Sequence, residues 1–244
     1  MIGSYIASAL TMKIVGVTMG EFRFKYENRY AETQGYDGFL ADKEELNNFF
    51  ETSVKGKMAD HTTVGIDSTK QHIVNVCYDC NIPLWMEIYE RVTNIGNKCG
   101  VKLNWDEFKH CMRFTFIWMP PGGDLAPHTA AYFRALCAFN IPLRGKTEIS
   151  FYEHIDNGDA GDIVGPKVGP THEYFNPSFL NVNRFHGVKN DTPDERMILK
   201  THLMIVPWDK AIQSVEGDEQ VNLWDFTVPW QQKHVPLNNK AYSK

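Results

Sequence analysis

RFTFIWM at residues 113–119, followed at once by PPGG at residues 120–123, is the stretch that decides the fold. A run rich in β-branched and aromatic side chains that ends in a Pro/Gly turn is typical of a strand. Further strand-length runs, separated by turn clusters, follow at residues 132–143, 147–152, 181–185 and 197–206. Because no helical pattern is interposed, the sequence predicts an antiparallel sandwich or barrel, of which the cupin-like jelly roll is one solution.

The residues before this region follow a different pattern. Residues 81–100 predict a helix, with Pro83 in its first turn and apolar side chains at helical spacing: Leu84, Ile88, Val92 and Ile95. We therefore expect one domain over residues 1–244, mainly β with bracing helices. Its parts are a helical and irregular support region at 1–111, a β core at 112–206 and a C-terminal extension at 207–244.

Charge and hydropathy exclude several classes of partner. Lys and Arg number 25 and Asp and Glu number 30, which gives a formal net charge of −5. We therefore expect no nucleic-acid partner, because nucleic-acid binding needs a basic surface. No run approaches the length of about 20 apolar residues that spans a bilayer, so no membrane partner is expected either.

The N-terminus and the cysteines bear on the compartment. The first twenty residues lack the basic start of a secretory signal, because their one basic residue, Lys13, lies in the middle. Five cysteines are an odd number at low density, which fits free thiols in a reducing compartment. The sequence therefore predicts a cytoplasmic protein.

Two histidines and an arginine lie where strands would bring them together. His128 follows Pro127 at the predicted start of a strand, His186 ends the run at 181–185, and Arg196 opens the next strand. In a rolled sheet two such histidines can converge and bind a metal through neutral imidazole nitrogens. A guanidinium beside them could pair with a carboxylate through two hydrogen bonds. This combination is what a nonheme iron site that uses 2-oxoglutarate requires.

The residues around these three side chains resemble a known family. PGGDLAPHT at 121–129 resembles the signature of the aspartyl/asparaginyl β-hydroxylase family, which is Pro-Gly, four residues, then Pro-His-Thr. Arg134, eight residues before Pro142, is similar to the arginine strand of that family, which ends in Ile-Pro. His186, with Asn190 and Arg196 after it, is similar to the family's second metal ligand, asparagine and co-substrate arginine. The resemblance covers residues 112–206.

The resemblance implies both a fold and a chemistry. The fold is a double-stranded β-helix that binds Fe(II) through His128 and His186, and Arg196 holds the distal carboxylate of 2-oxoglutarate. Arg134 and Asn190 belong to the same co-substrate site. The implied reaction is hydroxylation of an amino-acid side chain of the Asp/Asn type, in a small-molecule or peptide substrate.

Two positions leave alternatives to the hydroxylase activity open. Leu136 stands where the family has the histidine of an Arg-x-His pattern, so one hydrogen bond to 2-oxoglutarate is lost. Ala130 stands where a His-x-Asp pattern would supply a metal carboxylate, which agrees with the family but also leaves a place for chloride. A halogenase on the same scaffold and a catalytically silent jelly roll that binds a ligand therefore stay open.

Other patterns compete with this site. His154-Ile155-Asp156 could bind a metal together with His202, and Cys77 with Cys80 forms half of a zinc pattern. Cations near the predicted mouth could receive an acidic substrate: Arg144, Lys146 and Lys167. The sequence names no substrate and no oligomeric state.

Overall fold

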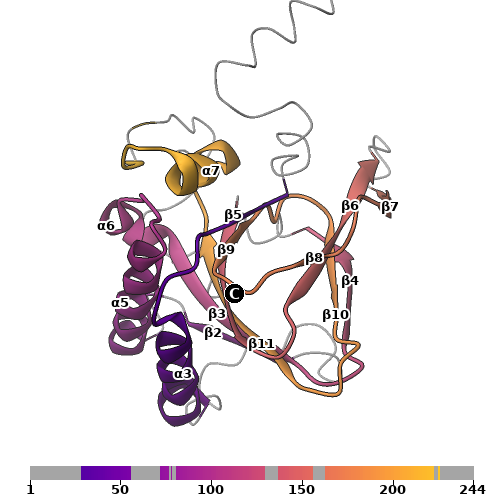
Figure 1. Cartoon of the computed structure of the whole chain (residues 1–244), viewed down its shortest axis with the longest axis horizontal. Helices are drawn as coiled ribbons and strands as arrows, with labels where there is room; N and C mark the ends of the chain where they lie inside the picture. Colours follow the sequence, from indigo (N-terminus) through magenta and orange to yellow (C-terminus); the bar gives the residue numbers. More distant parts are fainter. Residues whose placement is uncertain are drawn as a thin grey trace, which may run out of the picture.

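The computed structural model describes residues 29–55, 72–76, 78, 81–129, 137–155, 163–222 and 225, and they form two antiparallel sheets (Figure 1). The six-stranded sheet has the order β1-β9-β5-β11-β3-β2, and the five-stranded sheet has the order β4-β10-β6-β7 with β8 paired to β6. The strands are β1 (Tyr30–Glu32), β2 (His72–Val76), β3 (Met112–Met119), β4 (Asp124–His128), β5 (Cys137–Arg144), β6 (Glu148–Ile155), β7 (Ile163–Lys167), β8 (His172–Glu173), β9 (Ser178–Leu180), β10 (His186–Lys189) and β11 (Arg196–Leu203).

The core strands alternate between the two sheets, apart from β6, β7 and β8, which all lie in the smaller sheet. The chain passes from β3 to β4, from β5 to β6 and from β9 to β10, each time crossing from the larger sheet to the smaller, and returns to the larger sheet in β11. The named strands of the described region pair only in antiparallel ladders. This winding of two sheets around one axis is a double-stranded β-helix, a cupin-like jelly roll. The predicted fold class is confirmed.

The helices pack on the outer face of the larger sheet, on the side away from the smaller sheet (Figure 1). They are α3 (Phe39–Phe49), the π-helix η2 (Phe50–Val54), α5 (Ile82–Lys98), α6 (Trp105–Phe108), the 3-10 helix η4 (Lys109–Cys111) and α7 (Trp208–Glu216). Trp85 of α5 and Leu199 of β11 belong to the same buried apolar cluster. The helices therefore share one core with the larger sheet. Among the described residues, no helix is long and apolar enough to cross a membrane.

Helix α5 confirms the helix that the sequence predicts at residues 81–100. Asn81 is its N-cap, and the side-chain oxygen accepts a hydrogen bond from the Leu84 amide at 3.1 Å. This bond satisfies one of the amides that a helix leaves free at its start. Pro83 lies in the first turn, where its missing N–H costs nothing.

Two predicted strand boundaries are wrong, and both concern the candidate metal ligands. Residues 181–185 form a turn, so His186 opens strand β10 instead of ending a strand. The side chain of Asn181 accepts from the Asn183 amide at 3.2 Å, a local bond that competes with strand pairing. His128 ends strand β4 instead of opening a strand.

The β structure also reaches outside the predicted core at 112–206. Strands β1 and β2 come from the predicted support region, and they form the two edges of the larger sheet. Strand β5 confirms the later part of the predicted strand at 132–143, and residues 130–136 lie outside the described residues. The support region therefore contributes strands as well as helices.

Candidate metal and co-substrate site

His128 and His186 lie directly opposite each other on neighbouring strands. The last residue of β4 pairs with the first residue of β10 in the antiparallel ladder, and a bulge follows His186 in the register. The centroids of the two imidazole rings are 4.4 Å apart. The sheet register thus brings together the two residues that the sequence singled out, although 58 positions separate 128 from 186.

Each histidine is held in one tautomer by the backbone. The Nδ1 atom of His128 lies 2.9 Å from the carbonyl oxygen of Ala126, and Nδ1 of His186 lies 2.8 Å from that of Arg184. A carbonyl oxygen only accepts, so Nδ1 carries the proton and donates it in both rings. The lone pair of each imidazole is therefore on Nε2, which is the arrangement that outer hydrogen bonds impose on metal-binding histidines.

The surroundings keep both imidazoles neutral. Burial lowers the pKa of His128 and, far more strongly, that of His186, which is only 3% exposed. The nearby ammonium group of Lys200 lowers the pKa of both rings further. Neutral imidazole is the form that binds a metal ion.

Strand β11 presents its polar side chains to these histidines. Met197, Leu199 and Leu203 belong to the apolar cluster shared with the helices. Side chains alternate across a strand, so the residues between them face the smaller sheet. This inner face of β11 carries Arg196, Ile198, Lys200 and His202.

Arg196 is a buried cation with part of its hydrogen-bonding capacity unused. Its side chain is 2% exposed and hydrogen-bonds to the hydroxyl group of Tyr174, which also accepts from Asn140 Nδ2 at 3.2 Å. The Nε atom of Arg196 has no hydrogen-bond partner in the described part of the chain. Burial lowers the pKa of Arg196, and the hydroxyl of Tyr174 and the carboxylate of Glu148 oppose that shift.

Lys200 is a second buried cation on the same face of β11 as Arg196. It is 8% exposed, and burial lowers its pKa to about 7, with further lowering by the guanidinium groups of Arg113 and Arg196. Within the described residues no carboxylate forms an ion pair with its ammonium group. A buried cation without a counter-ion is costly, and such groups concentrate at functional sites.

Asn190 has a structural role in the turn before β11. Its Nδ2 donates to the carbonyl oxygens of Met119, Pro120 and Asp194 at 3.0, 3.1 and 2.8 Å. Its Oδ1 accepts from the Thr192 hydroxyl at 2.7 Å. The side chain is 2% exposed, and both of its polar atoms already form hydrogen bonds within the protein. Asn190 is therefore not part of the co-substrate site that we propose below.

Replacing Asn190 by alanine is expected to lower the free energy of unfolding by about 2–3 kcal/mol, because several buried hydrogen bonds are lost and their carbonyl partners stay buried. Denaturant unfolding measures this change. The affinity of the folded protein for 2-oxoglutarate should stay within about twofold of the wild-type value. A large loss of affinity without a loss of stability would restore Asn190 to the co-substrate site.

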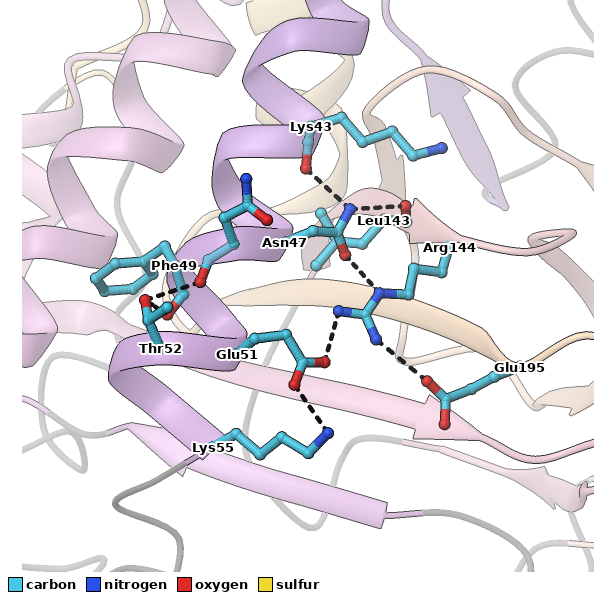
Figure 2. A network of polar contacts seen from close by, with 10 residues as sticks. Lys43, Asn47, Phe49, Glu51, Thr52, Lys55, Leu143, Arg144 and Glu195 are labelled. Carbon is cyan, nitrogen blue, oxygen red and sulfur yellow. Dashed lines mark hydrogen bonds and ion pairs between the residues drawn. The ribbon is translucent and has the colours of Figure 1, made fainter.

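The cations at the end of the larger sheet are already paired within the protein. Arg144 donates to Asn47 at 2.9 Å, to Glu51 at 2.7 Å and to Glu195 at 3.4 Å. These contacts, drawn in Figure 2, tie helix α3 and η2 to the end of β5 and to the residue before β11. Lys146 pairs with Glu148 at 2.8 Å and with Glu173 at 3.5 Å, and Lys167 donates to Thr171. These three side chains are therefore weak candidates for receiving an acidic substrate.

The competing metal site is not assembled among the described residues. His154 is exposed on β6, whereas His202 is buried on the inner face of β11 close enough to His186 for the two to interact electrostatically. Asp156, Cys77 and Cys80 lie outside the described residues, and so do Arg134, Leu136 and Ala130. Within the described part of the chain, no group of three or more His, Cys, Asp or Glu side chains could hold a metal ion. A protein-bound metal there would have two imidazole ligands and open positions.

Sequence reasoning missed Lys200 and Tyr174. The signal for Lys200 is a charged residue inside the apolar run MILKTHLMIV at 197–206, because a lysine in the middle of a buried strand needs a partner or a function. Tyr174 follows strand β8 directly, and nothing in the sequence around it marks it as a neighbour of Arg196.

The chain was compared with protein-family models, with curated proteins and with solved structures. No protein-family model and no curated protein matches the chain. Among solved structures, a mutant oxalate decarboxylase of Bacillus subtilis aligns at 10% identity and a TM-score of 0.32, over 57% of this chain and 27% of that one. The vicilin of Solanum melongena aligns at 9% identity and a TM-score of 0.35, over 61% and 31%. The 7S globulin of Momordica charantia aligns at 10% identity and a TM-score of 0.34, over 60% and 33%.

The chain thus spans about a third or less of the length of these proteins. Likenesses at such TM-scores carry no argument about activity. The assignment of the fold rests on the strand order, and the assignment of the site rests on the residues themselves.

Proposed function

We propose that the protein is an Fe(II)/2-oxoglutarate-dependent oxygenase that hydroxylates an amino-acid side chain, free or within a peptide. The observation that carries this proposal is the pair His128 and His186, opposed in the sheet register with both Nδ1 atoms tied to carbonyl oxygens. The buried guanidinium of Arg196, facing the smaller sheet, is the natural partner for a co-substrate carboxylate. The substrate type comes from the family resemblance of residues 112–206.

Fe(II) with bound 2-oxoglutarate and O2 supplies the oxidising power: the substrate gains a hydroxyl group, and 2-oxoglutarate becomes succinate and CO2. The protein's part is to position the reactants. His128 and His186 would hold the metal by two neutral nitrogens and leave several positions open for co-substrate and O2. Arg196 would fix the distal carboxylate, and Tyr174 and Asn140 would hold the Arg196 side chain in place.

The proposal is tested by anaerobic titration of the protein with Fe(II) and then 2-oxoglutarate, followed by the visible metal-to-ligand charge-transfer band. We expect a band in the wild-type protein and none in His128→Ala, which has lost half of its protein ligands. Arg196→Ala should still give the band, but only at 2-oxoglutarate concentrations at least about tenfold higher. The exposed His154, replaced by alanine, is the matched control and should leave the titration unchanged.

Turnover then separates the candidate activities. Oxygen-dependent formation of succinate in the presence of a hydroxylated product supports the hydroxylase, and a chlorinated product that forms only with chloride supports the halogenase. Absence of the band and of succinate formation in the wild-type protein would contradict both activities and favour a jelly roll that binds a ligand without chemistry.

A further inference from the structure

Between the two sheets, the described residues place positive charge that the described carboxylates do not fully neutralise. Arg196 and Lys200 both lie on the inner face of β11, four positions apart, which places their Cα atoms about 13 Å apart at about 3.3 Å per residue. Both side chains are more than nine-tenths buried. They are near enough for the guanidinium to act on the ammonium group. The carboxylate of Glu148 partly balances Arg196, whereas no carboxylate of the described residues balances Lys200, and a bound anion would relieve the cost of that buried charge.

The immediate neighbours of Lys200 in the sheet are neutral. Thr115 of β3 and Asn140 of β5 flank it in register. The Thr115 hydroxyl donates to Asn75, and the side-chain oxygen of Asn140 has no hydrogen-bond partner among the residues that the structure describes. Neither neighbour therefore supplies a charge to balance Lys200.

The electrostatic contacts give an order to the groups. The ammonium group of Lys200 acts on both His128 and His186, whereas Arg196 acts on Lys200 and is not among the groups that act on the histidines. Lys200 is therefore the cation of this face whose charge reaches both histidines, and Arg196 lies four positions away from it at the start of β11. An anion that spans the histidine pair and Arg196 would lie beside Lys200.

We propose that Lys200 is the second cationic contact of the co-substrate: its ammonium group binds the carboxylate next to the metal ligands, while Arg196 binds the distal carboxylate. The inference rests on the proposed function for the place of the metal. It deepens that function, because two cations four positions apart on one strand select a 2-oxo acid with a carboxylate at each end. Lys200 would thereby supply a contact in place of the one lost at Leu136.

The test measures binding of 2-oxoglutarate and 2-oxobutyrate to the metal-free protein by calorimetry in the presence of a chelator. 2-Oxobutyrate retains the 2-oxo acid end and lacks the distal carboxylate. We expect Lys200→Met to weaken both compounds at least about tenfold, since each loses a charge-assisted hydrogen bond. Arg196→Met should weaken 2-oxoglutarate by a similar factor and leave 2-oxobutyrate within about twofold of its wild-type affinity.

Two controls keep the result interpretable. Lys210→Met removes an ammonium group on helix α7, which lies on the helical side of the larger sheet, and should leave both affinities unchanged. Lys200→Met should fold at least as stably as the wild-type protein, because it replaces an uncompensated buried charge with an apolar side chain of similar length.

The outcomes separate this inference from the proposed function. If Lys200→Met binds both compounds as the wild-type protein does, or if the wild-type protein binds neither without metal, the role of Lys200 is refuted. In either case, a charge-transfer band of the wild-type protein with Fe(II) and 2-oxoglutarate would leave the proposed function standing. Conversely, the expected pattern of affinities without any metal binding would support the anion site and refute the oxygenase.

Discussion

Replacing Gly145 by alanine is expected to cost about 2–5 kcal/mol of unfolding free energy and to weaken the binding of 2-oxoglutarate. Gly145 has φ of 63°, a left-handed conformation that costs an L residue about 1–2 kcal/mol. A Cβ atom there would also lie 2.5 Å from the carbonyl oxygen of Glu195 and 3.1 Å from the Cα of Arg196. The start of β11 would have to move, and overpacking of that kind adds about 1–3 kcal/mol.

Denaturant unfolding and 2-oxoglutarate titration measure the two effects separately. Gly100→Ala is the matched control: Gly100 follows helix α5, its φ is 76°, and a Cβ atom there would meet nothing within 4 Å. It should lose only the conformational part, about 1–2 kcal/mol, and bind 2-oxoglutarate normally. Equal losses of stability in the two variants would show that the contact of Gly145 with Glu195 is unimportant.

Lowering the pH from 7 to 5 is expected to cost about 2 kcal/mol of stability through His172 alone. The His172 ring is 9% exposed and stacks on Tyr30, with the ring centroids 3.4 Å apart, and burial lowers its pKa to about 4. An unfolded histidine binds its proton below about pH 6.5. The unfolded state therefore binds more protons between about pH 6.5 and 4, and stability is lost as the pH falls through that window. His186 and His202, whose pKa values burial also lowers, act in the same direction.

Denaturant unfolding at pH 7 and pH 5 checks this expectation. His172→Phe retains an aromatic ring for the stack and removes the titrating group, so its loss of stability between the two pH values should be smaller than the wild-type loss by about 2 kcal/mol. The exposed His154, replaced by glutamine, should leave the wild-type pH dependence as it is. An unchanged pH dependence in His172→Phe would mean that His172 has the same pKa in the folded protein as in the unfolded chain.

The fold class could be predicted from the sequence because strand composition and turn chemistry act locally. RFTFIWM at 113–119 becomes β3 almost residue for residue, and Arg196 opens β11 as expected. The strand at 181–185 could not be predicted correctly, because the Asn181 side chain forms a local turn that apolar patterning does not reveal. The pairing of β1 and β2 into the larger sheet was also hidden, since those contacts link positions far apart in the chain.

The candidate site was predictable in part, for a similar reason. The family signature identifies His128 and His186, and the ladder between β4 and β10 brings them together. The sequence could not reveal that the side-chain amide of Asn190 donates to three backbone carbonyl oxygens, because those bonds depend on how two distant turns meet. Nor could it reveal that Lys200 has no carboxylate partner among the described residues, since that depends on the side chains across the interior.

The candidate site is divided between two sheets, of which only the larger packs against the described helices. The cations Arg196 and Lys200 lie on the larger sheet, which the helices brace, whereas His128 and His186 lie on the smaller sheet. The smaller sheet contributes Ile149 and Phe151 to a cluster that has fewer described members than the one between the larger sheet and the helices. We therefore expect local opening of the smaller sheet to require less free energy than opening of the larger one. A metal with its anionic ligand would connect the two sheets, so that amide hydrogens of β4 and β10 exchange with solvent more slowly in the loaded protein than in the free one.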